Sequence, residues 1–345
     1  MPEVRCTGSP RARGEAHGEA LRGQIALGLA RWSESIASAH SVDPDQYIAE
    51  FVAGTDFLPA IQQWTPDLLE EMEGIAAGAN QPWHWIYAYN LLDEEWTWAR
   101  RYRSHGAPGC TAVGVVGANG TPVLGQTMDI PSVHDGTQAV LHLEGATGPD
   151  VVLFTHAGII GLTGCNSHGL ALVVNNLEVL PASERGLPVT FVMRGILDRV
   201  NLADAVDFVA AAPHATGQHY GMASPAGFAS VEGWGTGTAI AARLDSCLLH
   251  TNHPLYTEET EGDVEIPYRR SRTRERLDYI GGAVEANQGV AGVKALLSDR
   301  SVPVSLAADR PVMTFGAVVY ECTSPPRMWV APGPPHETPF REVAW

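Results

Sequence analysis

The stretch GCTAVGVVGANGTPVLGQTMD, residues 109–129, is the part of the sequence that decides the fold. Two apolar runs, 110–116 and 121–128, have the length of ordinary strands. Between them stands the dipeptide Asn119-Gly120, which best fits a two-residue type I′ turn. The stretch therefore predicts an antiparallel hairpin whose first strand begins with a cysteine.

The turn also predicts which residues of the hairpin face one another. If the dipeptide 119–120 is the whole turn, its two flanking residues pair, and Cys110 then faces Asp129. Directly opposed residues point to the same face of a sheet, about 5 Å apart. This register predicts a carboxylate beside the thiol at the open end of the hairpin. The alternative is an aspartate that only ends a strand.

Cys110 also lies where the sequence changes character. The chain before residue 105 has helical periodicity, and the chain after Cys110 has strand-like runs. A second Gly-Cys pair, at Cys165, lies inside a strand pattern, where a buried and inert thiol is typical. Position therefore favours Cys110 as a nucleophile.

The cysteine spacing indicates neither a disulfide framework nor a metal site. The five are widely scattered, without a C-x-x-C pair, at Cys6, Cys110, Cys165, Cys247 and Cys322. This spacing predicts neither a zinc ribbon nor a set of disulfides. The N-terminus has no apolar core of the kind found in secretory signals. We therefore expect reduced thiols in a cytoplasmic protein.

Composition excludes several chemistries. The charge of −17, from 22 basic and 39 acidic side chains, argues against nucleic acid as a partner. Lys294 is the single lysine, so the sequence has no GK[ST] phosphate loop and no S-x-x-K pair. No apolar run approaches the roughly 18 residues of a membrane span, so we expect no membrane partner.

The order of the remaining patterns predicts an α+β fold with antiparallel sheets. Helical patterns come first, strands follow, and two further groups of helices and strands complete the chain. We expect helices at 12–40, 66–79, 82–102, 188–200, 202–212, 268–284 and 286–298. We expect the later strands at 151–158, 159–165, 169–177, 219–224, 228–233, 238–244, 247–252, 312–322 and 327–332.

The segment HTNH, residues 250–253, combines two histidines with an asparagine. His250 and His253 suggest a zinc site, and a zinc hydrolase is one alternative function. On an extended segment, however, they face opposite sides, and a third ligand with defined spacing is missing. Asn252 is more informative, because an amide at a strand end can donate to an oxyanion.

These motifs in this order resemble the isopenicillin-N acyltransferase-like family of N-terminal-nucleophile (Ntn) hydrolases. The resemblance rests on GCTAVGV, NG and GQTMDI, then AGIIG and NSHGLALVVNN, and finally HTNHPL. RGEAHGEALRGQI and EEMEGIAAGA resemble the family's leading segment. The similarity runs from about residue 13 to about residue 331.

The resemblance implies a four-layer αββα sandwich with a helical N-terminal segment. It also implies a precursor that cuts itself between Gly109 and Cys110. Residues 1–109 would form a helical, propeptide-derived chain and residues 110–345 the catalytic chain, which together make a self-derived heterodimer. The α-amino group freed at Cys110 would then act as the base for its own thiol, so no cofactor and no metal are expected.

Carried over by position, the family's other site residues fall on Asp129, on Asn175 or its neighbour Asn176, on Asn252 and on Arg310. The two asparagines would donate to the oxyanion, and the arginine would pair with the aspartate or polarise the surroundings of the thiol. The match departs from the family around Asp129. Thr127, Met128 and Ile130 stand where an asparagine and aromatic residues are common, which puts the acyl pocket in doubt.

The implied function is hydrolysis of a linear, non-peptide amide bond through an S-acyl intermediate on Cys110. The alternative is an acyltransferase that passes the acyl group from an amide or thioester to an amine. Coenzyme A would favour a basic surface, and one run offers it, formed by Arg269, Arg270, Arg272, Arg274 and Arg276. Such a run is more often a solvated helix face. An inactive binding or scaffold protein is a further alternative, against which the retained Asp129, Asn175 and Asn252 argue.

Overall fold

A computed structural model describes residues 1–99, 109–145, 148–244, 246–302 and 304–345. Within these residues the strands form two sheets, of eight and six strands. The large sheet has the order β1-β4-β5-β6-β7-β8-β9-β10 and the small sheet the order β11-β2-β3-β12-β13-β14. Neighbouring strands are antiparallel except for the parallel pair of β1 and β4.

The strands of the large sheet are β1 (Glu3–Thr7), β4 (Gln138–Glu144), β5 (Val151–His156), β6 (Thr163–Asn166), β7 (Ala171–Asn176), β8 (Gln218–Ser224), β9 (Gly227–Trp234) and β10 (Gly237–Leu244). Those of the small sheet are β2 (Cys110–Val116), β3 (Pro122–Pro131), β11 (Cys247–His250), β12 (Val312–Glu321), β13 (Arg327–Ala331) and β14 (Arg341–Val343).

The α-helices are α1 (Pro10–Ala20), α2 (Arg22–His40), α3 (Pro44–Ala53), α4 (Leu58–Trp64), α5 (Asp67–Ala79), α6 (Trp83–Tyr89), α7 (Leu92–Ala99), α8 (Val189–Leu197), α9 (Leu202–Ala211), α10 (Glu265–Ser271), α11 (Thr273–Ala283) and α12 (Gly289–Leu297). Two short 3₁₀ turns, η1 (Ser132–His134) and η2 (Val284–Ala286), complete the elements. No helix among the described residues has both the length and the apolar character of a membrane span.

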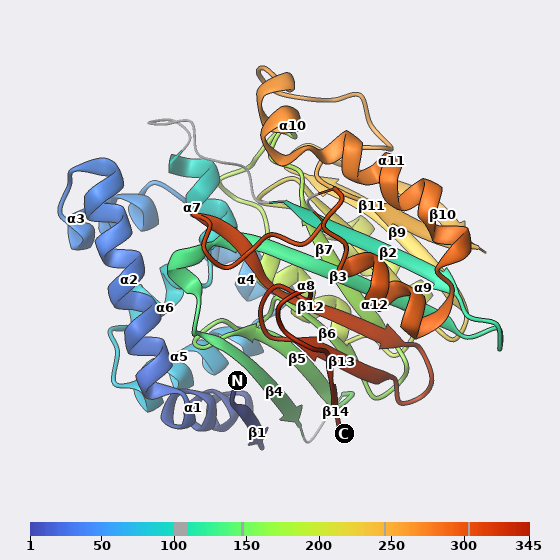
Figure 1. Ribbon diagram of the computed structural model, residues 1–345. Coiled ribbons are helices and arrows are strands. Elements are labelled where there is room, and N and C mark those ends of the chain that lie inside the picture. The colour runs from blue at the N-terminus through green and yellow to red at the C-terminus, as the bar shows by residue number, and fades with distance from the viewer. Residues whose placement is uncertain (100–108, 146–147, 245, 303) are drawn as a thin grey trace.

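The buried side chains divide into layers that follow the strand alternation. In β2, Ala112 faces the core between the two sheets, whereas Val113 packs outward against the layer of α11 and α12. In β7, Val173 faces the same inner core, and Leu172 packs against the N-terminal helices. Figure 1 shows the two sheets between these helical layers. The α+β class and the four-layer αββα arrangement are therefore confirmed.

The N-terminal segment is helical, as expected, but it begins with a strand. Residues Glu3–Thr7 form β1, which pairs in parallel with β4 at the edge of the large sheet. This strand has no clear sequence pattern, because it is short and its side chains are mostly exposed. The first 99 residues therefore share both a sheet and a hydrophobic core with the rest of the chain.

Glycines explain how the leading segment packs. Helices α1 and α5 cross closely, and a Cβ on Gly14 would lie 1.9 Å from the carbonyl oxygen of Glu71. A Cβ on Gly78 would lie 2.3 Å from the carbonyl oxygen of Glu15. No side chain fits at these distances, so glycine is required where the two backbones touch.

Candidate active site

The hairpin that carries Cys110 forms, but its turn differs from the prediction. Gly117 N–H donates to the carbonyl of Thr121 at 2.8 Å, so the loop has three residues, 118–120. Gly120 has a φ of 80°, the left-handed position of a three-residue hairpin loop. The extra loop residue shifts the pairing by one, and Cys110 faces Met128. The predicted pairing of Cys110 with Asp129 is wrong.

Asp129 nevertheless lies at the same end of the hairpin as Cys110, beside Gly109. A Cβ built on Gly109 would lie 3.2 Å from Asp129 Oδ2. Thr314 of β12 donates its hydroxyl to Asp129 Oδ1 at 2.5 Å. Oδ2 is buried and has no hydrogen-bond partner. The carboxylate therefore lies beside the Gly109–Cys110 peptide, and its charge also acts on the Cys110 thiol.

Burial controls the acidity of both groups. It raises the pKa of the Cys110 thiol to about 12, with a further increase from the charge of Asp129. It also raises the pKa of Asp129 to about 7, although Thr314 and Arg276 act in the opposite direction. The thiol is thus neutral near pH 7 and needs a base to become a nucleophile. Asp129 titrates in the range that suits a general base.

A buried arginine, Arg276 of α11, completes the surroundings of Cys110. Its Nη1 donates to the Cys110 carbonyl at 2.5 Å and to the Thr111 hydroxyl at 2.9 Å. Its Nη2 donates to Asn252 Oδ1 at 2.7 Å. The side chain is fully buried, so the guanidinium fixes the backbone on the C-terminal side of the Gly109–Cys110 bond.

Arg310 does not reach this site. It is exposed in the turn before β12, where its backbone N–H bonds to the Ala307 carbonyl at 3.4 Å. The guanidinium beside Cys110 belongs to Arg276, which the sequence analysis placed in the basic run of residues 269–276. The expected helix 268–284 is broken at Arg272, which has a φ of 50°. The break leaves Arg276 facing inward.

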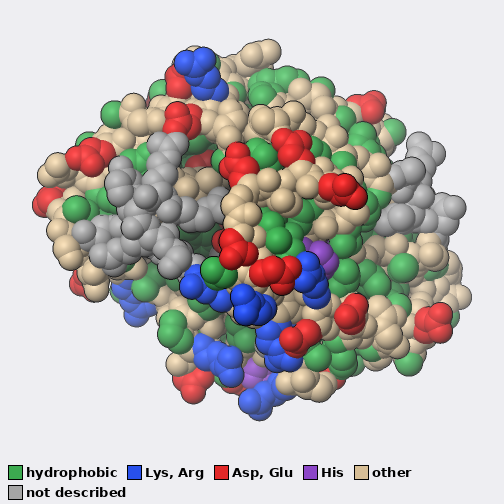
Figure 2. Space-filling view, turned by 90° about the horizontal axis from the view of Figure 1, so that it is seen from above, with side chains coloured by type: hydrophobic (Ala, Val, Ile, Leu, Met, Phe, Trp, Pro, Cys, Tyr) green, Lys and Arg blue, Asp and Glu red, His purple; other side chains and the backbone are tan. Residues whose placement is uncertain are grey.

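The basic run is in part internal and in part paired with acidic side chains. Arg276 is internal, and Arg272 and Arg274 form ion pairs with Glu275 and Glu265. Figure 2 shows basic side chains gathered on one face with acidic side chains beside them. Of the five arginines expected to form a surface for coenzyme A, four are exposed and Arg276 is internal.

Asn252 touches Cys110 directly, with its carbonyl end. Its Oδ1 accepts a hydrogen bond from the Cys110 N–H at 2.7 Å. Its Nδ2 donates to the Asn176 backbone carbonyl at 3.0 Å. One N–H of the amide is therefore engaged, and the amide oxygen holds the nitrogen that would become the α-amino group after cleavage.

Asn175 is the asparagine with a free donor. Its Oδ1 is 2.8 Å from His219 Nδ1, and the Nε2 of the same ring is 2.7 Å from Ser230 Oγ. Burial holds the pKa of His219 well below its usual value, so the ring is neutral. Asn175 Nδ2 is buried without a hydrogen-bond partner. Asn176 differs, because its Nδ2 donates to Asp93 at 3.2 Å.

The two histidines of the HTNH segment have separate partners. His250 lies 2.9 Å from Glu232 and stacks on His219, with ring centroids 3.6 Å apart. His253 lies 2.9 Å from the Thr273 hydroxyl. Within the described residues, no group of three His, Cys, Asp or Glu side chains could hold a metal ion. The zinc alternative therefore has no support from the site.

Cys110 lines a cavity of about 70 Å³ whose wall is formed by strands of both sheets and by α6, α7 and α8. Its apolar walls are Leu92, Trp96, Met128, Ile130, Ile159, Leu162, Val174, Val189 and Met193. Its polar groups include Asp93, Asn176 and Gln218. Tyr89, Leu92, Asp93 and Trp96 of α6 and α7 supply one side of this wall, so both of the expected chains contribute to it.

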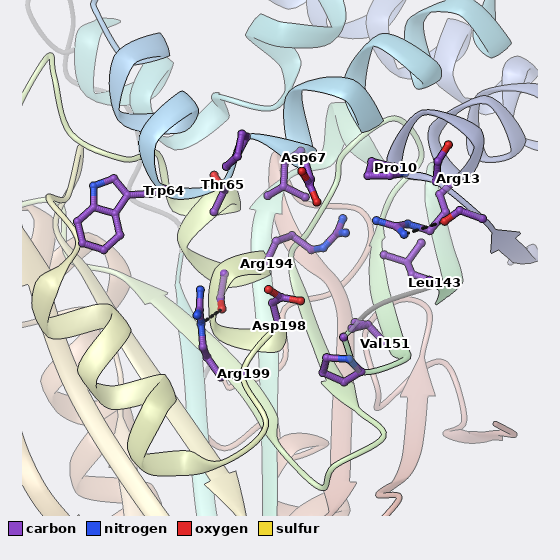
Figure 3. Close-up of a pocket in the computed structure, with 18 of the residues that line it drawn as sticks. Pro10, Arg13, Trp64, Thr65, Asp67, Leu143, Val151, Arg194, Asp198 and Arg199 are labelled. Carbon is purple, nitrogen blue, oxygen red and sulfur yellow. Dashed lines mark hydrogen bonds between the residues drawn. The ribbon is translucent and has the colours of Figure 1, made fainter.

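A larger cavity, of about 630 Å³, lies elsewhere, between α1, α5 and the end of α8. Figure 3 shows the side chains of Arg13 and Arg194 reaching toward each other there. Both arginines pair with Glu71, at 3.3 and 2.6 Å. Cys110 does not line this cavity, which contains neither a thiol nor a histidine.

Comparison with known proteins agrees with the motifs around this site. Residues 115–331 match the family model described as acyl-coenzyme A:6-aminopenicillanic acid acyl-transferase. The 40 kDa form of that acyltransferase from Emericella nidulans is 26% identical over 215 residues. This match covers 60% of the present chain and 56% of the relative, so the chain spans little more than half of that relative's length.

Solved structures with a similar course of the chain are more distant. Penicillin V acylase from Agrobacterium tumefaciens is 14% identical, with a TM-score of 0.40 over 65% of this chain and 83% of that one. A variant of the conjugated bile acid hydrolase from Clostridium perfringens is 11% identical, with a TM-score of 0.42 over 68% and 97%.

Proposed function

This chain belongs to the acyl-coenzyme A:6-aminopenicillanic acid acyl-transferase family, and we propose on that premise that it is a self-cleaving cysteine amide hydrolase. Cys110 is its nucleophile, and the substrate is a linear, non-peptide amide. The observation that carries this proposal is the set of contacts on Cys110. Asn252 holds its nitrogen, Arg276 holds its carbonyl, and Asp129 lies beside Gly109.

Self-cleavage begins at the bond between Gly109 and Cys110. Asp129 accepts the proton of the thiol, and Sγ attacks the Gly109 carbonyl carbon. The C–N bond breaks as a thioester forms, and the leaving nitrogen of Cys110 takes up the proton. Water then hydrolyses the thioester, which releases the carboxylate of Gly109 and restores the thiol. Asn252 Oδ1 holds the nitrogen throughout.

Turnover uses the amine that this cleavage creates. The neutral α-amino group of Cys110, with an ordinary pKa of about 7.7–8, accepts the thiol proton. Sγ attacks the substrate carbonyl, the amine product leaves with the proton, and water hydrolyses the S-acyl enzyme. Asn175 Nδ2 is a buried donor without a partner, and it supplies a hydrogen bond to the oxyanion.

The two products of cleavage stay together as a heterodimer. Glu71 of the first segment forms a buried pair with Arg194 of the second, at 2.6 Å. Glu94 accepts the backbone N–H of Val189 at 3.0 Å. Both segments also share one hydrophobic core. Separating them would expose that core and remove Asp93 and Trp96 from the cavity at Cys110.

Acyl transfer is the second candidate, because the matched relative is named as an acyltransferase. It differs in the last step alone, where an amine replaces water as the acceptor of the acyl group. Hydrolysis is our first choice, since Arg276 is internal and Arg272 and Arg274 are paired with glutamates, which weakens the basic surface that coenzyme A would favour.

Intact-mass analysis of the purified full-length protein tests the proposal. Cleavage before Cys110 divides the 36.9 kDa chain into products of about 12 and about 25 kDa, in proportion to their lengths. A panel of acyl amides, with and without an added amine acceptor, then separates hydrolysis from transfer. A purified protein that stays in one piece and cleaves no amide would refute the proposal.

Self-cleavage should also depend on pH. Because burial raises the pKa of Asp129 to about 7, the carboxyl is protonated below that pH and cannot accept the thiol proton. The rate should rise with pH through about 7 and then level off. The measurement is a pH jump on chain made by cell-free translation, followed on denaturing gels. A rate that falls across this range would contradict the role of Asp129.

The Gly109→Ala chain should cleave itself more slowly. The new Cβ would lie 3.2 Å from Asp129 Oδ2 and 3.4 Å from Arg276 Nη2, so these groups must move by a few tenths of an ångström. We expect a decrease of about 10-fold, since catalysis depends on such positions. Gly23→Ala is the control, because a Cβ there meets nothing within 4 Å. Equal rates for both variants would show that Gly109 is not constrained.

A further inference from the structure

Asp93 of α7 places a carboxyl group in the wall of the cavity at Cys110. Its Oδ2 accepts hydrogen bonds from Asn176 Nδ2 at 3.2 Å and from Gln218 Nε2 at 2.7 Å. These two amides come from the neighbouring strands β7 and β8, so they fix the carboxyl in one orientation. Its other oxygen, Oδ1, has no hydrogen bond to any described residue.

No cationic side chain among the described residues pairs with Asp93. Its recorded partners are the two neutral amides, and burial raises the pKa of its carboxyl. The adjacent Gln218 is fully buried, and its Oε1 has no hydrogen-bond partner. A half-buried carboxyl whose described partners are neutral amides, beside a buried acceptor without a described partner, favours a hydrogen-bond donor in the cavity.

Asp93 is also close to the nucleophile. Both residues line the same cavity, and the charge of Asp93 contributes to the raised pKa of the Cys110 thiol. The rest of the wall is mainly apolar, with Leu92 and Trp96 on the same helix. A group bound there meets mainly apolar contacts, and Asp93 is the carboxyl group that it can reach among the described lining residues.

We propose that the substrate of Cys110 carries a cationic ammonium group, which pairs with Asp93 inside this cavity. This inference rests on the proposed function and adds the charge of the substrate to it. The cavity of about 70 Å³ is well below the ~300–1,000 Å³ of sites for drug-sized ligands. The group between the ammonium and the scissile amide is therefore short.

The ammonium belongs either to the acyl part or to the amine part of the substrate, and two series of amides distinguish them. The first has β-alanyl, 3-hydroxypropanoyl and butanoyl p-nitroanilides, which end in ammonium, hydroxyl and methyl. The second compares the monoacetyl amide of 1,4-diaminobutane with N-pentylacetamide. Within each series the compounds have nearly the same shape and differ in charge.

In one of the two series, the full-length processed enzyme should prefer the ammonium compound in kcat/KM by about 10²-fold or more over the methyl compound. Asp93→Asn should reduce this preference to a few-fold, with the ammonium and methyl compounds compared within the same variant. The control is Glu95→Gln, a buried carboxyl on the same helix that bonds to Tyr47 and does not line the cavity. It should keep the full preference.

A binding measurement separates this inference from the proposed function. Protection of Cys110 from alkylation by iodoacetamide is followed by peptide mass spectrometry. If the ammonium is on the acyl part, β-alaninamide should protect at about 10²-fold lower concentration than butanamide; if it is on the amine part, the monoacetyl amide of 1,4-diaminobutane should do so relative to N-pentylacetamide. Asp93→Asn should abolish the difference. Protection without turnover of any amide would refute the proposed function and keep the inference. The inference would be overturned if charged and neutral compounds had equal kcat/KM values and protected Cys110 at equal concentrations. A preference for the ammonium compound that survives Asp93→Asn would also overturn it.

Discussion

The Cys110→Ala chain should migrate as a single 36.9 kDa band and hydrolyse no amide. The substitution removes the atom that attacks both the Gly109 carbonyl and the substrate, and no other described thiol lines the cavity. Loss of an enzyme's nucleophile typically lowers the rate by about 10⁶-fold, so turnover should fall to background. The fold should persist, because the side chain is small and its backbone contacts with Asn252 and Arg276 remain.

Cys165→Ala is the matched control for this experiment. Cys165 also follows a glycine and is also buried, but it lies in β6 within the core between the sheets. Its variant should cleave itself as the unchanged chain does. Cleavage that persists in Cys110→Ala, or that stops equally in Cys165→Ala, would show that the thiol of Cys110 is not the nucleophile.

The α+β class and the hairpin could be predicted from local periodicity, whereas the four layers were implied by the family resemblance of the motifs. The register of the hairpin was predicted wrongly. Asn119-Gly120 fits a two-residue turn, but the bond between Gly117 and Thr121 adds Ala118 to the loop. One extra residue reverses which side chains share a face. Turn length depends on backbone hydrogen bonds that the residue types alone do not specify.

The site arginine could not be found from sequence pattern. Arg276 belongs to a run of arginines with the appearance of an exposed helix face, and only the break at Arg272 turns it inward. The start of α11 is held beside Asn252 by Thr273, whose hydroxyl accepts the Asn252 N–H at 2.7 Å. This contact spans 21 residues, so no local sequence pattern indicates it. Asp93 was missed for the same reason. Its partners lie on β7 and β8, far along the chain.

The Asp129→Asn chain should fold and cleave itself about 10²–10⁴-fold more slowly, the range typical for loss of a general base. An amide occupies nearly the same volume and can still accept the Thr314 hydroxyl, so the strand pairing of β3 with β12 is kept. It cannot accept a proton from the thiol, whose pKa burial holds near 12. The rate is measured on chain made by cell-free translation, at several pH values.

Thr314→Val distinguishes a base from a structural aspartate. The Thr314 hydroxyl lowers the pKa of Asp129, so its removal should raise that pKa further and leave the carboxyl in place. Self-cleavage should then reach the same maximal rate, but its rise with pH should shift to higher pH. In Asp129→Asn this rise should disappear, because the titrating group is gone. If Asp129 served only to hold the strands together, Thr314→Val would lower the rate equally at every pH, and Asp129→Asn would keep the pH profile of the unchanged chain.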